Sequence, residues 1–220
     1  MNQKIATIFG GSGFIGRHLI RRLTKRDYRI IVATRSPHSS GFLKPLGDSG
    51  QVELIKTNIY DPEDIKNVLQ RSSFAINLVG ILHENSKQKF NYIHSEFPNL
   101  LSKICNELNF EKLIHLSALG VKKEHISKYM QSKFQGEECI QNNFKSSIIL
   151  RPSVIFGPED KFFNTFASLS QFSPILPLIG GGTTKFAPIF VEDVADAIVQ
   201  TLKKMNSEPI IYELGGPKNY

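Results

Sequence analysis

The stretch "IFGGSGFIGRHL" at residues 8–19 contains four glycines, at positions 10, 11, 13 and 16. Glycine loses more conformational freedom on folding than any other residue, so this concentration requires a structural reason. The glycines match both a GxGxxG and a GxxGxxG spacing, and the stretch follows an apolar run and opens a helix-like segment. That context predicts the pyrophosphate site of a dinucleotide, whereas the spacing alone is a weak signal. The alternative is a tight turn that binds nothing.

The same stretch predicts how a phosphate would be held. Without Cβ atoms the backbone can turn tightly and approach the phosphate, and the start of the helix offers N–H groups and a partial positive charge. We therefore expect the following residues to bind a cofactor: Gly10, Gly11, Ser12, Gly13, Phe14, Ile15 and Gly16.

The remaining chain alternates strand-like and helix-like segments. Apolar runs predict buried strands at 4–9, 28–35, 52–59, 74–80, 112–119, 146–153 and 211–216, and helical patterns lie at 14–26, 61–69, 88–109 and 129–141. Asp61 and Pro62 suit the first positions of the second helix. Strands separated by helices of this length predict a doubly wound parallel sheet, the α/β Rossmann fold.

The domain organisation follows from this alternation. We expect residues 1–156 to form an NAD(P)-binding Rossmann domain, and residues 157–220 to form a small, partial substrate lobe, of which 189–205 returns to the core.

Composition narrows the class of protein. With 40% hydrophobic and 21% charged residues, the 220-residue chain is neither disordered nor fibrous. It has no apolar run of the roughly 20 residues that span a membrane, and the glycine loop leaves no room for a signal peptide. We expect a cytoplasmic protein, or one peripheral to the inner face of a membrane. Neither Cys105 nor Cys139 has metal-ligand spacing, so no metal and no disulfide are expected.

The chain is basic, with a formal net charge of +7. Such a charge suits nucleic acid or an anionic membrane surface. The lysines are scattered rather than gathered with aromatic residues, which favours a solvated basic face, and no nucleic-acid partner is expected.

The end of the second strand indicates which dinucleotide is bound. NAD sites usually place an acidic residue there, about 20 residues past the glycine loop, to bind the ribose 2′-hydroxyl. This chain has Thr34 and Arg35 instead. Because Arg35 can pair with a 2′-phosphate, with Arg17 assisting, the sequence predicts NADP(H) in preference to NAD(H). The alternative for Arg35 is a solvated strand end.

A second group of residues suggests proton transfer. Tyr129 and Lys133 are four residues apart in "SKYMQSK", which on a helix places both side chains on one face. The ammonium is then expected to lower the pKa of the phenol, so that the tyrosine can exchange the proton that accompanies hydride transfer.

Together, these motifs resemble the short-chain dehydrogenase/reductase superfamily, in its extended or atypical branch of epimerase- and dehydratase-like proteins. The resemblance covers "GGSGFIG", "NLVG" (77–80), "HLSALG" (115–120), "YMQSK", "LRPSVIFGPED" (150–160) and "FVEDVADAI" (190–198). More narrowly, "RPSVIFGPEDKFFNTFA" followed by "LPLIGGGTTKFAPIFVEDVADAI" is similar to bacterial relatives of the Rossmann-type nucleotide-binding accessory subunit of respiratory complex I.

The resemblance implies a bound NADPH and a set of site residues. Beyond the glycine loop, it implies cofactor contacts from Arg35, Asn58, Ile59, Leu78, Val79, Gly80, Tyr129, Lys133, Pro152, Ser153 and Val154. Many extended members carry a second hydroxyl after the strand-five serine, where this chain has Ala118 following Ser117. Ser117 precedes Tyr129 by twelve residues, as in the compact branch, so it is a third catalytic candidate. The alternative is a buried hydroxyl satisfied by the backbone.

The substrate side suggests an apolar ligand. Phe162, Phe163, Phe166 and Phe172, followed by "SPILPLIGGG" (173–182), predict either a pocket for a prenyl or quinone-like small molecule or simply the core of the lobe. Two classes of function remain. One is an NADPH-dependent oxidoreductase or epimerase. The other is a cofactor-holding subunit or assembly factor of a membrane respiratory NADH:quinone complex, or a protein linked to quinone biosynthesis.

Overall fold

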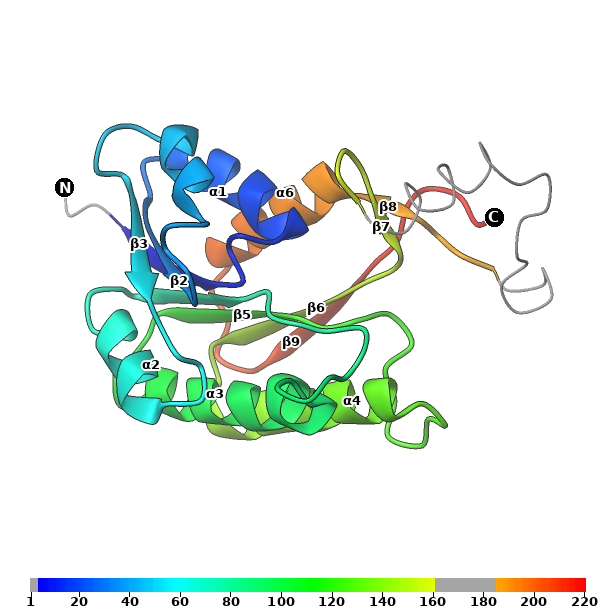
Figure 1. The fold of residues 1–220 in the computed structure, drawn as a ribbon. Coiled ribbons are helices and arrows are strands. Elements are labelled where there is room, and N and C mark those ends of the chain that lie inside the picture. Colours follow the sequence, from blue (N-terminus) through cyan, green and yellow to red (C-terminus); the bar gives the residue numbers. More distant parts are fainter. Residues whose placement is uncertain (1–3, 161–184) are drawn as a thin grey trace.

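The structure, a computed structural model, describes residues 4–160 and 185–220. In this part of the chain, seven parallel strands form one sheet in the order β3-β2-β1-β4-β5-β6-β9 (Figure 1). The strands are β1 (Ile5–Phe9), β2 (Arg29–Thr34), β3 (Val52–Lys56), β4 (Phe74–Asn77), β5 (Lys112–Leu116), β6 (Ser147–Pro152) and β9 (Ile210–Leu214). The strand order reverses between β1 and β4, which confirms the predicted doubly wound sheet.

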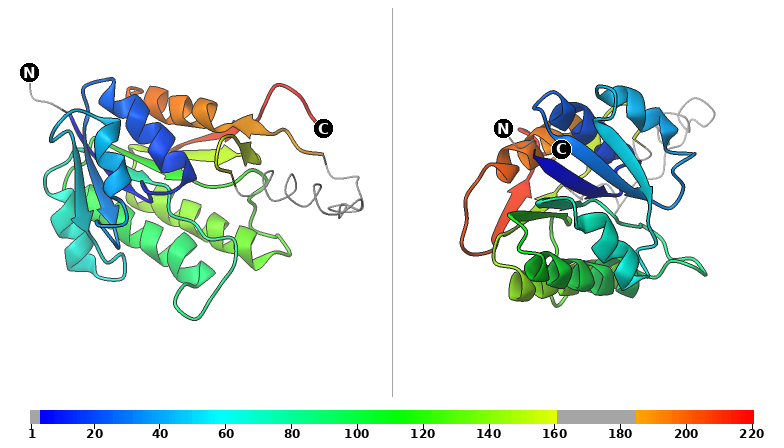
Figure 2. Two further views of the ribbon diagram at one scale, coloured as in Figure 1. Left: turned by 45° about the horizontal axis from the view of Figure 1, so that its top comes forward. Right: turned by 90° about the vertical axis from the view of Figure 1, so that its left-hand side faces the viewer.

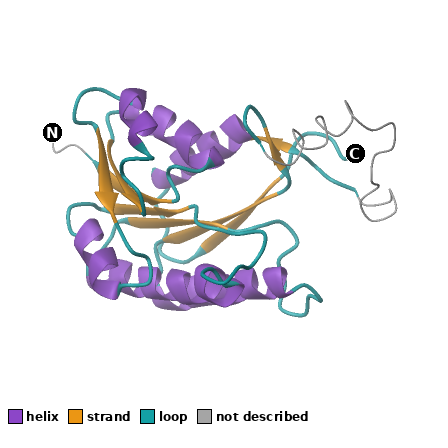
Figure 3. Ribbon diagram, viewed as in Figure 1, coloured by secondary structure: helices purple, strands orange, loops and turns teal. Residues whose placement is uncertain are grey.

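Helices cover both faces of the sheet (Figures 1 and 3). One face carries α1 (Phe14–Thr24) and α6 (Val191–Leu202), with the short 3₁₀ helix η1 (Gly41–Leu46) beside α1. The other face carries α2 (Pro62–Leu69), α3 (Phe97–Glu107) and α4 (Lys128–Asn143), as the end-on view in Figure 2 shows. Each helix layer buries its own apolar cluster against the sheet, so the core lies on both sides of the strands.

The late elements also belong to these layers. Helix α6 packs along α1, where Arg22 pairs with Asp196 at 2.8 Å and His18 pairs with Glu192. Strand β9 extends the sheet beside β6, so the sheet takes in residues beyond the expected 189–205. A separate two-stranded pair, β7 (Ile155–Phe156) and β8 (Ile189–Phe190), lies at one end of the molecule (Figure 1).

Most helices and strands begin and end near the residues that the sequence pattern predicts. Asp61 caps α2 as expected, because its side chain accepts a hydrogen bond of 3.0 Å from the backbone N–H of Glu63. Several strands end earlier than expected. The largest differences are in β3, β4 and β5, which end at Lys56, Asn77 and Leu116 and leave 57–59, 78–80 and 117–119 as loops at the carboxyl edge of the sheet.

The expected helix at 88–109 also differs. It begins as a π-helical turn, η2 (Tyr92–Glu96), which runs directly into α3. A π-helical turn leaves no distinct hydrophobic period, so the sequence pattern could not separate it from the helix that follows.

The packing of α1 on β1 depends on one glycine. A Cβ atom on Gly16 would lie 2.4 Å from the carbonyl oxygen of Gly11, a backbone atom that cannot move aside. The start of α1 therefore rests directly on the loop that leaves β1.

This contact predicts a large loss of stability in Gly16→Ala. Because the added methyl group forces backbone apart from backbone, we expect the free energy of unfolding to fall by about 2 kcal/mol or more in urea titrations. Gly41→Ala is the matched control, since nothing lies within 4 Å of its added Cβ. Its stability should stay within about 0.5 kcal/mol of the parent. Equal stability of the two variants would contradict the proposed packing.

Candidate functional site

The glycine loop leaves the first turn of α1 open to an anion. Gly13 has an extended backbone at the start of α1, and its N–H donates to the carbonyl of Gly10 at 3.0 Å. No side chain caps this helix, and its first turn contains no acidic residue. A Cβ on Gly13 would meet only the Gly10 oxygen, at 3.2 Å. The N–H groups of the first turn are thus available to a phosphate, and the loop fits a dinucleotide.

The segment after β4 lies against this loop. Gly10 has a φ of +80°, and a Cβ on it would lie 3.0 Å from the backbone of Leu78. The N–H of Leu78 donates to Phe9 at 2.9 Å, and the N–H of Val79 donates to the side chain of Asn77 at 3.0 Å. The first bond holds the ends of β1 and β4 together at the point where the strand order reverses, and the second shapes the loop that leaves β4.

The end of β2 carries no acidic residue. Thr34 is buried, and its hydroxyl lies 3.0 Å from that of Ser40. Arg35 is exposed and makes no hydrogen bond or ion pair with the rest of the described chain. Arg17, which was expected to assist, pairs with Glu159 and lies over the ring of Phe42 at 5.2 Å. Of these two arginines, Arg35 is therefore the one whose side chain has no partner in residues 4–160 and 185–220.

The residues after β3 lie at the same edge of the sheet. The N–H of Asn58 donates to Asp64 at 3.0 Å, and its side-chain oxygen accepts from the N–H of Tyr60 at 3.1 Å. Ile59 packs against the apolar cluster under α2 and α3. Both residues are therefore held by local contacts rather than by the strand.

The turn after β6 is tied to three neighbouring segments. The carbonyl of Pro152 accepts from Leu119 at 2.9 Å, and the N–H of Ser153 donates to Leu214 at 2.8 Å. The carbonyl of Val154 accepts from the N–H of Ile189 at 2.9 Å. This turn therefore has little freedom to move.

Lys133 is buried on α4 beside the loop after β4. Its Nζ donates to the carbonyl of Leu116 at 3.1 Å, and it lies 3.5 Å from the position that a Cβ on Gly80 would occupy. Burial lowers the pKa of Lys133 to about 8, opposed by the nearby carboxylate of Glu137. Glu137 is itself buried in an ion pair with Arg151 at 2.6 Å.

Tyr129 lies half-buried one turn before Lys133. Its ring packs edge to face on His94, with centroids 5.2 Å apart, and on Phe90 at 5.7 Å. Burial raises the pKa of the phenol, and the lysine is not among the causes of that shift. The expectation that Lys133 lowers this pKa is therefore wrong for this structure, because the ammonium is directed to the Leu116 carbonyl.

Ser117 follows β5 and is buried. Its N–H donates to Leu150 at 2.7 Å, but its hydroxyl has no hydrogen-bond partner among the described residues. The alternative role of Ser117, a buried hydroxyl that hydrogen-bonds to the backbone, is therefore not found among the described residues. Along β5, Leu113 faces α3 and α4, so His115 and Ser117 face the same way by strand alternation.

Sequence reasoning missed the buried polar residues behind this site. Asn77 and His115 pair across β4 and β5, with 3.1 Å between Nδ2 and Nδ1, and burial lowers the pKa of His115 well below its usual value. His94 accepts from the N–H of Ile81 at 3.1 Å. The polar residues that interrupt the apolar runs "FAIN" and "KLIHL" were the available signal.

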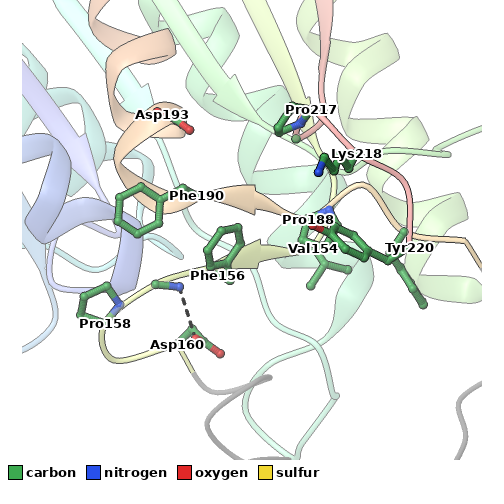
Figure 4. A pocket seen from close by; sticks show the side chains of 13 residues that line it. Val154, Phe156, Pro158, Asp160, Pro188, Phe190, Asp193, Pro217, Lys218 and Tyr220 are labelled. Carbon is green, nitrogen blue, oxygen red and sulfur yellow. Dashed lines mark hydrogen bonds between the residues drawn. The ribbon is translucent and has the colours of Figure 1, made fainter.

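A cavity of about 950 Å³ lies beside β7 and β8 (Figure 4). One hydrogen bond on its wall joins the N–H of Gly157 to Asp160 at 3.3 Å. The phenylalanines at 162, 163, 166 and 172 and the stretch 173–182 lie outside the described residues. Most lining side chains are apolar: Val154, Phe156, Pro158, Phe186, Pro188, Phe190, Pro217 and Tyr220, with Asp160, Asp193 and Lys218 as charged members.

Within residues 4–160 and 185–220, every helix is too short or too polar to span a lipid bilayer. No group of three or more histidine, cysteine or acidic side chains in those ranges is placed to hold a metal ion.

The sheet order, the glycine loop and the reversal point define a Rossmann-type fold, a class whose members bind dinucleotides where the strand order reverses. The sequence matches the NAD dependent epimerase/dehydratase family over residues 6–215, and the chain belongs to that family. Its fold is similar to that of UDP-glucuronic acid 4-epimerase from Bacillus cereus, with a TM-score of 0.80 and 21% identity over 98% of this chain and 79% of that one. The fold of DesIV (dTDP-glucose 4,6-dehydratase) from Streptomyces venezuelae matches with a TM-score of 0.83 and 19% identity, over 98% and 77% of the two chains.

Curated relatives are closer in sequence. The chain is 37% identical to the mitochondrial NADH dehydrogenase [ubiquinone] 1 alpha subcomplex subunit 9 of Arabidopsis thaliana, over 97% of this chain and 54% of that protein. The mouse (Mus musculus) protein of that name is 32% identical, over 98% and 58%. A ceramide reductase of Caulobacter vibrioides is 27% identical, over 89% and 60%. The resemblance predicted from the motifs is confirmed, and the chain spans little more than half the length of these relatives.

The buried Lys133 predicts a specific pH dependence of stability. Between its folded pKa of about 8 and its ordinary value of 10.5, the unfolded chain binds a proton that the folded chain has released. The free energy of unfolding therefore gains a contribution that rises across this window by about 3 kcal/mol.

Lys133→Met should remove that rise. The measurement is urea titration of both proteins from pH 7 to 10.5. As the pH rises, we expect the free energy of unfolding of the parent to increase steadily relative to that of the variant. A difference that stays constant across the window would contradict the burial of a titrating lysine.

Proposed function

We propose that this chain binds a nicotinamide dinucleotide at the carboxyl edge of the sheet. The observation that carries the proposal is the uncapped first turn of α1, opened by Gly13 and joined through Leu78 to the loop that reaches Lys133. The pyrophosphate would be held by the glycine loop, residues 10–16. A bound nicotinamide would supply hydride chemistry. Asn58, Ile59 and the 152–154 turn lie at strand ends on this edge and would complete the binding site.

The proposed cofactor is NADP(H) rather than NAD(H). The loop between Arg35 and Gly47 contains no acidic residue to bind a ribose 2′-hydroxyl, and it is rich in serine. Arg35 is exposed and its side chain has no partner in the described part of the chain, so its guanidinium can form charge-assisted hydrogen bonds to a 2′-phosphate.

We propose Tyr129 as the proton donor of an oxidoreductase. The phenol carries its proton at neutral pH, since its ordinary pKa of about 10 is already high and burial raises it further. It is therefore in the form that donation to a substrate oxygen, as in reduction of a carbonyl group, requires. Lys133, on the same helix, would hold the ribose beside Gly80. The hydroxyl of Ser117, which has no hydrogen-bond partner among the described residues, would be a second donor to that oxygen. The apolar cavity beside β7 and β8 favours an apolar or quinone-like substrate.

A second candidate is a cofactor-holding subunit of a membrane respiratory complex. The identity of 37% and 32% to subunits of NADH dehydrogenase favours it. In that case the dinucleotide would stabilise the fold, and the protein would associate peripherally with the membrane complex rather than turn over a substrate.

Arg35→Ala should weaken NADPH binding while leaving NADH binding nearly unchanged. We expect the parent to prefer NADPH by about tenfold or more, since one charge-assisted pair supplies about 1.4 kcal/mol or more. Calorimetric titration with both cofactors measures this preference. Lys122→Ala, at another exposed cation, is the control and should bind like the parent. Equal affinities of the parent for NADPH and NADH, or a preference for NADPH that is unchanged in Arg35→Ala, would contradict the NADP(H) assignment.

Tyr129→Phe and Gly13→Val together separate the two candidates. Gly13→Val should abolish dinucleotide binding, because its side chain fills the space that the pyrophosphate needs. Tyr129→Phe should lower turnover by about 10²-fold or more in an enzyme, with NADPH affinity nearly intact. The measurement is complementation of a deletion strain by the two variants of the full-length protein.

Loss of complementation by both variants supports the oxidoreductase. Loss by Gly13→Val alone supports the cofactor-holding subunit. Retained NADPH binding in a folded Gly13→Val protein would contradict both candidates.

A further inference from the structure

His94 lies in the π-helical turn η2 and is almost fully buried, with 1% of its surface exposed. Each ring nitrogen has its own partner. Nε2 accepts from the backbone N–H of Ile81 at 3.1 Å, so in the neutral ring the proton is on Nδ1. Nδ1 then donates to the hydroxyl of Ser132 at 3.0 Å, and this hydroxyl donates to the carbonyl of Tyr129 at 2.8 Å. One fixed tautomer thus joins the loop after β4 to the first turn of α4.

The ring of His94 is also clamped by aromatic contacts. The ring of Phe90 stacks on it at 5.4 Å with 18° between the planes, and the ring of Tyr129 meets it at 5.2 Å and 88°. The phenol proposed as proton donor therefore rests on an imidazole that cannot rotate without breaking two hydrogen bonds.

The backbone of His94 is fixed as firmly as its ring. Its carbonyl oxygen lies only 1.8 Å from where a Cβ on Gly136 would be, so η2 and α4 are in direct backbone contact. On the other side, a Cβ on Gly80 would lie 3.8 Å from His94 Nε2 and 3.5 Å from Lys133 Nζ. His94 therefore stands between the segment expected to contact the dinucleotide and the helix that carries Tyr129 and Lys133.

We propose that His94 is a positioning residue, which holds the 78–81 loop and the Tyr129 ring in one fixed arrangement. The proposal rests on the proposed function, in that the loop contacts the dinucleotide and the phenol donates the proton. His94 itself touches neither the cofactor nor the reacting atoms in this account.

The electrostatic surroundings keep His94 neutral. Burial, with a smaller effect of Lys133, lowers its pKa to about 3. The ring therefore does not titrate near neutral pH, and its two hydrogen bonds persist through the range in which Lys133 and Tyr129 change charge. A neutral amide can replace part of its role, which makes a conservative rescue possible.

Two variants of His94 separate its contacts. His94→Phe keeps an aromatic ring but loses both hydrogen bonds. His94→Gln loses the ring but places an amide oxygen where it can accept from Ile81. The readouts are the dissociation constant for NADPH and the ¹⁹F NMR signal of 3-fluorotyrosine incorporated at position 129 of the full chain. His83→Phe, at an exposed histidine of the neighbouring loop, is the matched control.

We expect His94→Phe to weaken NADPH binding roughly tenfold, because the Ile81 amide loses its acceptor and the loop is released. His94→Gln should restore affinity to within about threefold of the parent, yet shift or broaden the fluorine signal, because the ring that supports the phenol is gone. His83→Phe should change neither readout. Parent-like behaviour of His94→Phe in both readouts, or failure of His94→Gln to recover NADPH affinity, would overturn the proposal.

Ser132→Ala tests the same series of hydrogen bonds, from His94 through Ser132 to Tyr129, without altering the histidine. This variant should bind NADPH with an affinity near that of the parent, but the fluorine signal of position 129 should shift. An unchanged fluorine signal would overturn the proposal even if His94→Phe fails to fold. Because the fluorine readout needs no bound nucleotide, it decides the role of His94 even if the parent binds no NADPH, a result that would refute the proposed function instead.

Discussion

The backbone of Gly16 rests on the backbone of Gly11, and no side chain larger than hydrogen can be placed between them. This approach seats α1 on the end of β1 and aims its first turn at the carboxyl edge of the sheet. The same loop meets the end of β4 through Gly10, which fixes the point where strand order reverses. Since ligands of open parallel sheets bind at such a point, the whole candidate site depends on this one close contact.

A second close contact fixes the other half of the site. Gly136 lets α4 approach η2 so closely that the carbonyl of His94 lies where a Cβ would otherwise be. That approach brings Lys133 under the sheet edge, where burial lowers its pKa, and brings Tyr129 against an imidazole that is itself neutral. The two halves meet at Gly80, whose lack of a side chain leaves room beside Lys133. Glycines at these positions therefore shape the site as much as its charged residues do.

The sequence predicted the features that depend on local pattern. The glycine spacing, the apolar runs and the Asp61 cap each carry a short-range signal, and the sheet built from them is confirmed. It did not predict features that depend on tertiary approach. Burial raises the pKa of the Tyr129 phenol, and the ammonium of Lys133 donates to a backbone carbonyl. The four-residue spacing alone shows neither feature. The sequence also did not indicate the role proposed for His94, because its hydrogen-bond partners come from segments far apart in the chain.

The central claim is that a dinucleotide lies across the glycine loop and the segment after β4. Amide hydrogen exchange of the full-length protein, measured with and without NADPH, tests it most directly. We expect NADPH to slow exchange at the amides of residues 11–17 and 78–81, because the bound ligand would cover the open first turn of α1 and restrain the loop after β4. NADPH binding that leaves these amides unchanged and protects another part of the chain would contradict it.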